Sequence, residues 1–265
     1  TVSVDSELVK MSYRYPILDF DSDRSAVAEP SSVIARNEKM PEHCVLCFFQ
    51  NAIDELMARK QVTVITNLRS EMGPHPVYLL KDVEPGVALF QPGIGAPLAA
   101  ALFEELIALG GRKFIACGTA GVLDSSISSG QLLIPVEAVR DEGTSYHYMP
   151  PGKEVHPTAK ALKAIEATLT NANASFRKVK TWTTDGIYRE TRGKINKRKN
   201  SGCSCVDMEA SALFSVAEFR GVEFGQVFLA ADDAGGESWD PRDCFGMEGE
   251  REKTLQMAVE ACKLI

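Results

Sequence analysis

The sequence has no long apolar run and no excess of positive charge. No window approaches the ~20 consecutive apolar residues that a membrane-spanning helix needs, and the opening TVSVDSELVKMSYRY lacks the apolar middle of a signal peptide. We therefore expect a soluble, cytoplasmic protein that does not act at a membrane. Lys and Arg total 29 against 36 Asp and Glu, which gives a net charge of −7 and argues against nucleic acid as the main partner. The locally basic residues 192–199, RGKINKRK, are expected to form a solvated helix face.

Residues of the kinds that form disulfides or bind metals are few and poorly spaced for either purpose. Seven cysteines are an odd number, spread over a long chain, and do not resemble a disulfide framework. Cys44 and Cys47 have C-x-x-C spacing but lie in the hydrophobic run CVLCFF, which favours buried thiols over a zinc or redox pair. We expect no metal site, because no H-x-x-x-H pair occurs among the four histidines, His43, His75, His147 and His156.

The remaining pattern is typical of a globular α/β protein. The chain has 265 residues, of which 45% are hydrophobic and 25% charged, enough for a sizeable core. Residues 1–40 are polar and interrupted by prolines, which predicts an arm that packs on the body or on a neighbouring subunit. Residues 41–265 show neither a repeat nor a linker, so we expect one domain.

Apolar periodicity predicts alternating strands and helices in residues 41–265, and hence a mixed or mostly parallel sheet. Strands are expected at residues 45–49, 62–67, 77–80, 87–91, 114–117, 131–139, 179–183 and 223–231, and helices at 51–59, 98–109, 157–171, 210–217 and 251–264. Ligands of such sheets bind beyond the strand ends, where the loops gather.

Residues 205–221, CVDMEASALFSVAEFRG, are the stretch around which the other motifs can be arranged. A short strand runs into an amphipathic helix, which places Glu209 in the first helical turn. The unpaired N–H groups of that turn would favour an ionised Glu209 whose oxygens remain free for a ligand. The plainer alternative is that Asp207 and Glu209 are only a helix cap and a first-turn acid.

Two glycine-bearing segments follow predicted strands and could expose N–H groups to an anion. The first, PGIGAP at residues 92–97, precedes a helix; it is not the dinucleotide fingerprint, because Leu98 stands where the third glycine should be. The second, GTAG at residues 118–121, carries a hydroxyl at its apex. The polar and aromatic residues 140–148, RDEGTSYHY, are either a site loop or a cap over the sheet or a subunit contact.

Together these motifs resemble the nucleoside phosphorylases of the hexameric uridine and purine class. The resemblance covers roughly residues 85–235 and is carried by GIG-A-P, EELIALG, GTAG, RDEGTSYHY and VDMEASALF in that order. The uridine phosphorylases match more closely in the GIG turn and in the loop. The resemblance implies a three-layer α/β/α sandwich with a central mixed sheet, and a homo-oligomer, either a dimer or a hexamer built from dimers.

The resemblance also implies roles for individual residues. Glu209 would bind the ribose hydroxyls, Met208 would pack against the sugar, and Gly95 and Thr119 would hold phosphate. Asp232 would protonate the departing base, provided that its neighbour Asp233 raises its pKa. The aromatic position beside the base falls on Ile187 or Tyr188.

One departure from the family pattern affects the co-substrate. Ala116 stands where the family usually carries an arginine that holds phosphate, and a guanidinium is the strongest phosphate contact available. The sequence therefore leaves three functions open: a phosphorylase without metal or organic cofactor, a hydrolase of the same fold, and a nucleoside-binding protein without turnover. Base preference also stays open. Four arginines could replace the missing one: Arg24, Arg36, Arg69 and Arg140.

Overall fold

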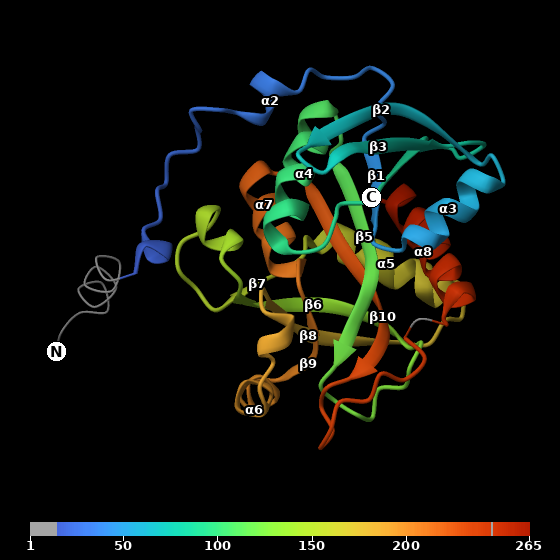
Figure 1. The fold of residues 1–265 in the computed structure, drawn as a ribbon. Helices are drawn as coiled ribbons and strands as arrows, with labels where there is room; N and C mark the ends of the chain where they lie inside the picture. The colour runs from blue at the N-terminus through green and yellow to red at the C-terminus, as the bar shows by residue number, and fades with distance from the viewer. Residues whose placement is uncertain (1–14, 245) are drawn as a thin grey trace.

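The computed structural model describes residues 15–244 and 246–265 (Figure 1). The part of the predicted arm before residue 15 lies outside this range. The strands are β1 (His43–Cys47), β2 (Val62–Ser70), β3 (Gly73–Leu80), β4 (Val87–Phe90), β5 (Lys113–Val122), β6 (Leu132–Asp141), β7 (Glu154–Val155), β8 (Phe176–Thr184), β9 (Cys203–Asp207) and β10 (Glu223–Asp233). The helices are η1 (Pro16–Leu18), α2 (Pro30–Val33), α3 (Gln50–Ala58), α4 (Ala96–Leu109), η2 (Thr144–His147), α5 (Ala159–Asn171), η3 (Ile187–Arg189), α6 (Arg192–Asn200), α7 (Ala210–Arg220) and α8 (Glu248–Lys263).

The sheet is mixed and partly closed on itself. Its strands follow the order β10-β6-β8-β9-β5-β1-β4-β3-β2, and β10 also pairs with β5. β5 pairs in parallel with β1 and β10, whereas its last residues pair antiparallel with β9. The strands β10, β6, β8, β9 and β5 thus form a ring, from which β1 to β4 extend as an open sheet.

Helices cover both faces of the sheet, which confirms the predicted three-layer fold. Figure 1 shows α4 and α7 on one side and α3, α5 and α8 on the other. Each side has its own buried cluster, the first built around Phe90, Phe103, Phe114, Phe214 and Phe224, and the second around the apolar faces of α3, α5 and α8. Burial of this apolar surface on both faces is the main stabilising term of the fold.

One segment predicted as a glycine turn is strand, and the last strand is longer than predicted. Residues 118–121, GTAG, continue β5 instead of leaving it, and Asp232 and Asp233 are the last residues of β10. A glycine in a strand often permits a close approach. A Cβ atom on Gly121 would lie 3.3 Å from the Asp232 carboxylate, so this glycine makes room for a polar side chain on the adjacent strand.

The described part of the arm lies against α4 and α7. Arg24 stacks on the Phe219 ring, with 4.6 Å between its guanidinium carbon and the ring centroid, and also donates to the Phe219 carbonyl. Arg220 forms a clamp with Glu104 of α4 at 2.5 and 3.0 Å, and with Glu29 of the arm at 3.0 Å. Whether the arm also contacts a neighbouring subunit stays a prediction.

The cysteine thiols, the possible metal ligands and the hydropathy of the helices can be assessed for the described part of the chain. All seven thiols are free, and Cys44 and Cys47 are buried as predicted. Within residues 15–244 and 246–265, no helix has the length and hydropathy of a membrane span, and no three His, Cys, Asp or Glu side chains converge on a possible metal site.

Candidate active site

A pocket of about 780 Å³ opens where β5, β9 and β10 end, between η3, α6 and the loop after β10. Its volume is that of a small-molecule site. Gly95 does not line it, although its neighbour Ile94 does. The lining includes the other residues to which the sequence assigned a site role: Thr119, Ile187, Tyr188, Met208, Glu209 and Asp232.

Glu209 is the N-cap residue of α7 and is only 8% exposed. Its Oε1 accepts a 2.6 Å hydrogen bond from the N–H of Gly95, so the glycine turn does bind an anion, but one supplied by the same chain. Gly95 has a φ of 94°, which favours glycine and turns its N–H toward the carboxylate. The N–H group of Gly95, which was predicted to bind phosphate, therefore donates to Glu209, the residue predicted to bind the ribose.

Asp207, and not Glu209, satisfies the first N–H groups of α7. Its Oδ2 accepts from the N–H of Glu209 at 2.8 Å and of Ala210 at 2.6 Å, and its Oδ1 accepts from the hydroxyls of Thr181 and Thr183, both at 2.9 Å. The side chain that caps α7 is thus that of Asp207, whereas the side chain of Glu209, although at the N-cap position, makes no capping hydrogen bond. Because the helix N-terminus is already occupied, burial first and Asp207 second raise the pKa of Glu209 to about 8. The expectation that the helix end keeps Glu209 ionised is wrong, because the raised pKa favours the protonated form at neutral pH.

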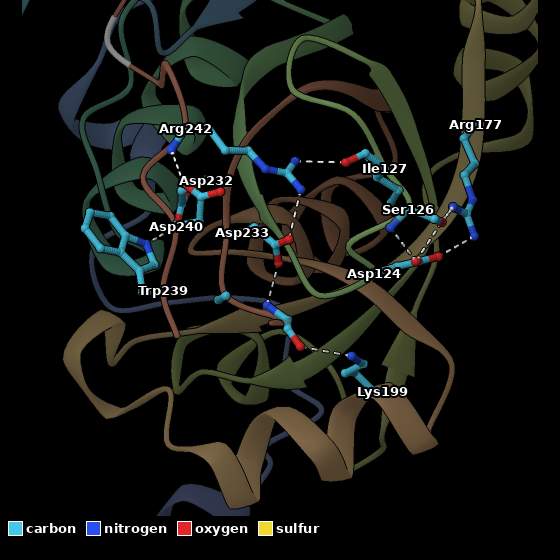
Figure 2. A network of polar contacts seen from close by, with 12 residues as sticks. Asp124, Ser126, Ile127, Arg177, Lys199, Asp232, Asp233, Trp239, Asp240 and Arg242 are labelled. Carbon is cyan, nitrogen blue, oxygen red and sulfur yellow. Dashed lines mark hydrogen bonds and ion pairs between the residues drawn. The ribbon is translucent and has the colours of Figure 1, made fainter. Parts of the chain in front are cut away.

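Asp232 and Asp233 point to different partners (Figure 2). The indole N–H of Trp239 donates to Asp232 Oδ2 at 2.7 Å, whereas Arg242 forms a 2.9 Å ion pair with Asp233. Neighbouring residues of a strand face opposite sides of a sheet, which explains the separation. Asp233 is therefore not the acid that acts on Asp232. Its own pKa lies below its usual range, because hydrogen bonds from Ser125 and the Gly235 N–H and the charge of Arg242 together outweigh the effect of burial.

The acid that does interact with Asp232 is Glu190, which the sequence did not single out. Glu190 follows η3 and lines the pocket. Burial first and the charge of Asp232 second raise the pKa of Glu190 to about 7. Two carboxyl groups at the same end of a pocket, one able to carry a proton at neutral pH, are suited to general acid chemistry.

The pocket contains arginines, but not the four that the sequence offered. Arg140 is buried and donates to Ser145 and to the carbonyls of Met149 and Pro150, and Arg24 is engaged with Phe219. Neither these two nor the remaining two, Arg36 and Arg69, line the pocket.

Arg192 and Arg251 line the pocket instead. Arg192 comes from the stretch predicted as a solvated face, and donates to the carbonyls of Ala234 and Glu237. Arg251 donates to the carbonyl of Cys244 at 2.6 Å. Arg192 is exposed, so the predicted solvated face holds at this position, and the same side chain also borders the pocket.

The loop at residues 140–148 does not contribute to this pocket. Glu142 accepts from the Ser211 hydroxyl at 2.8 Å and from the Ser145 N–H at 2.9 Å, which ties the loop to α7. Of the two interpretations left open, a site loop or a structural loop, the contacts within this chain fit the structural loop. His147 and Tyr148 of this loop line a second cavity of about 440 Å³ against the arm.

Comparison with known proteins gives one family. The profile of the phosphorylase superfamily matches residues 42–265. An uncharacterized protein of Acanthamoeba polyphaga mimivirus is 34% identical over 149 residues, which are 55% of this chain and 57% of that protein. The uridine phosphorylase of Treponema pallidum is 27% identical over 197 residues, covering 69% of this chain and 74% of its own length. This chain thus spans little more than half of the mimivirus relative.

The fold has close counterparts among solved structures. The purine nucleoside phosphorylase of Toxoplasma gondii superposes with a TM-score of 0.74 over 90% of this chain and 97% of that one, at 17% identity. At this identity the likeness concerns the fold alone. The family profile covers most of the chain, and the motifs that suggested the family lie within the matched region. The chain belongs to the phosphorylase superfamily.

Proposed function

We propose that this protein cleaves the N-glycosidic bond of a nucleoside with phosphate, giving free base and ribose or deoxyribose 1-phosphate. The observation that carries the proposal is the convergence of Thr119, Met208, Glu209 and Asp232 on one pocket, from separate strands of one sheet. Membership of the superfamily and the names of the relatives in Treponema pallidum and Toxoplasma gondii support the same reaction.

The sugar would bind at Glu209. Cleavage of this bond develops positive charge near C1′, so the site must fix the ribose and tolerate an oxocarbenium-like transition state. Glu209 Oε1 is held by Gly95, and its carboxylate offers further acceptor positions to two adjacent ribose hydroxyls. Hydroxyls that donate to the carboxylate favour its ionised form, so binding would lower the raised pKa of Glu209.

The base would lie at the Asp232 end of the pocket. Trp239 fixes one oxygen of Asp232, and protonated Glu190 is available to donate to the departing base. Ile187 and Tyr188 are 53% and 94% exposed, which leaves them free to close over a bound base. Because a carboxyl donor and a carboxylate acceptor can serve purines and pyrimidines alike, the base is left open.

A second candidate function, hydrolysis, is favoured by the surroundings of Ala116. This residue is fully buried, and the Phe48 ring packs over Gly118, where an added Cβ atom would meet it at 3.1 Å. Neither Ala116 nor Phe48 offers a guanidinium to a phosphate dianion. Water would then attack in place of phosphate, and the products would be free base and free ribose.

The test is to incubate the protein with a panel of purine and pyrimidine nucleosides, with and without phosphate, and to follow base and sugar products by chromatography. Phosphate-dependent release of base with ribose 1-phosphate is expected. Phosphate-independent release of base and ribose would select hydrolysis. Tight binding of a nucleoside with no base released over hours would refute both and leave a binding protein.

We also propose that the enzyme is a cytoplasmic homo-oligomer, a dimer or a hexamer built from dimers. The support is the resemblance to the hexameric class. Light scattering combined with activity measurement tests this, because a fully active monomer would exclude sites that borrow residues across subunits.

A further inference from the structure

Gln226 is a buried polar residue that no part of the proposed mechanism uses. It is 1% exposed, lies in β10 and lines the pocket. Within the described part of the chain, no group donates a hydrogen bond to its Oε1 atom. A buried polar atom without a partner destabilises the folded state, so an apolar side chain would stabilise the fold better at this position. A buried acceptor without a partner inside a pocket points to a ligand that donates a hydrogen bond to it.

The register of the sheet places Gln226 at the inner end of the pocket. Its partner across the parallel pair is Ala116, whereas Leu229 pairs with Thr119. Asp232 lies six residues further along β10, past a shift in register between Ala230 and Asp233, so the two residues are at most roughly 20 Å apart. The pocket therefore offers, in order, Gln226, then Thr119, then Asp232.

This order matches the order of reacting groups. The nucleophile must reach C1′ from the side of the sugar opposite to the departing base, as the attacking water does in inverting glycosidases. With the base at Asp232 and the sugar at Glu209, the nucleophile approaches from the inner end. The small side chain of Ala116 leaves room there, and Gln226 is the polar group next to it.

We propose that Gln226 holds the attacking oxygen nucleophile, an O–H group of hydrogen phosphate or of water, at the inner end of the pocket. The inference rests on the proposed cleavage of a nucleoside. The carboxamide accepts the O–H hydrogen bond through Oε1 and has an NH₂ group to donate to a second oxygen of phosphate. It has no titratable proton, so it orients the nucleophile without acting as a base.

The reaction balances without any further reagent. An oxygen lone pair of the nucleophile forms the C1′–O bond, and the C1′–N bond electrons pass to the base. The base takes the proton held at the Glu190 and Asp232 end. The proton of the nucleophile passes to solvent, and in the phosphate reaction the product is the sugar 1-phosphate.

The decisive variant is Gln226→Met, which keeps the length of the side chain and removes its polar atoms. Because it also removes a buried unpaired oxygen, it should fold at least as well as wild type, and the melting temperature checks this. Gln256→Met is the matched control, since Gln256 is an exposed residue of α8 and does not line the pocket. Steady-state kinetics are measured with nucleoside and phosphate varied separately.

If phosphate is the nucleophile, Gln226→Met should raise the KM for phosphate roughly tenfold or more, with the KM for nucleoside within twofold. If water is the nucleophile, kcat should fall by a similar factor at unchanged nucleoside KM. Unchanged kinetics with a raised melting temperature would overturn the assignment and make Gln226 an ordinary buried residue.

Two separate measurements distinguish an error in the proposed function from an error in the role of Gln226. A wild-type protein that releases no base from any nucleoside refutes the function. Binding of inorganic phosphate, measured by calorimetry, then tests Gln226. Binding by wild type that Gln226→Met abolishes would uphold its role in holding an oxygen ligand, and equal binding, or none by either protein, would overturn it.

Discussion

Replacement of Glu209 by glutamine tests both the electrostatics of the site and the role of this residue. In the folded protein, burial and Asp207 raise the pKa of Glu209 from 4.5 to about 8. Between these two values the folded state therefore binds a proton that the unfolded state has lost. The contribution of Glu209 to the free energy of unfolding must then decrease as pH rises from 4.5 to 8.

The size of this effect follows from the shift. One pKa unit corresponds to about 1.4 kcal/mol, so the penalty grows to about 3 kcal/mol at pH 7 and to about 5 kcal/mol above pH 8. Glu209 is 8% exposed, so solvent screening reduces these figures little. Glu209→Gln keeps an oxygen that can accept from Gly95 and removes the titration.

The assay is urea unfolding of wild type and Glu209→Gln at intervals from pH 4 to 9. The variant should match wild type near pH 4 and become progressively more stable above it, while base release falls by at least about 100-fold because a neutral amide cannot offset positive charge at the sugar. Other titrating groups are common to both proteins and cancel in the difference. A difference that does not change with pH, or a variant less stable than wild type at pH 8, would refute the reasoning.

Three further changes test other parts of the structure. Glu190→Gln should flatten the pH profile of kcat/KM around pH 7, because wild-type Glu190 is protonated below about 7 and loses its donor proton above it; an unchanged fall through pH 7 would contradict this. Asp207→Ala should lower the free energy of unfolding by about 2–4 kcal/mol, since two N–H groups and two hydroxyls lose their acceptor; a loss near zero in urea unfolding would show that water replaces it. Arg220→Met should lower the free energy of unfolding by about 3 kcal/mol, because buried Glu104 loses its ion pair. Protease cleavage of the arm should also become faster, because Glu29 is released. A variant as stable and as protease-resistant as wild type would refute the clamp.

The fold could be predicted from the sequence because its strands and helices show clear periodicity. The helix after PGIGAP and the one after Glu209 begin within two residues of the predicted starts. The errors occur at residues 118–121, which were interpreted as a turn, and at Asp232, which was placed just after the last strand. Gly121 and Asp232 lie in strands, since a pairing between β5 and β10 extends beyond the apolar run, and no local signal records that pairing.

The site could be predicted in part, namely those residues that a local sequence motif identifies. Glu209 and Asp232 stand out at the ends of apolar strands, whereas Glu190 and Trp239 gain meaning only from contact with Asp232 across 42 and 7 residues of chain. Gln226 offered one sequence signal, a lone amide within the apolar run of β10. The internal use of the Gly95 N–H by Glu209 could not be foreseen, because it joins residues 114 positions apart.

The most direct test of the account is a crystal structure of the protein soaked with a non-cleavable nucleoside analogue and phosphate. The account predicts sugar hydroxyls on the Glu209 carboxylate, the base beside Asp232 and Glu190, and an oxygen ligand at Gln226. An analogue bound in the reverse orientation, or bound outside this pocket, would contradict it.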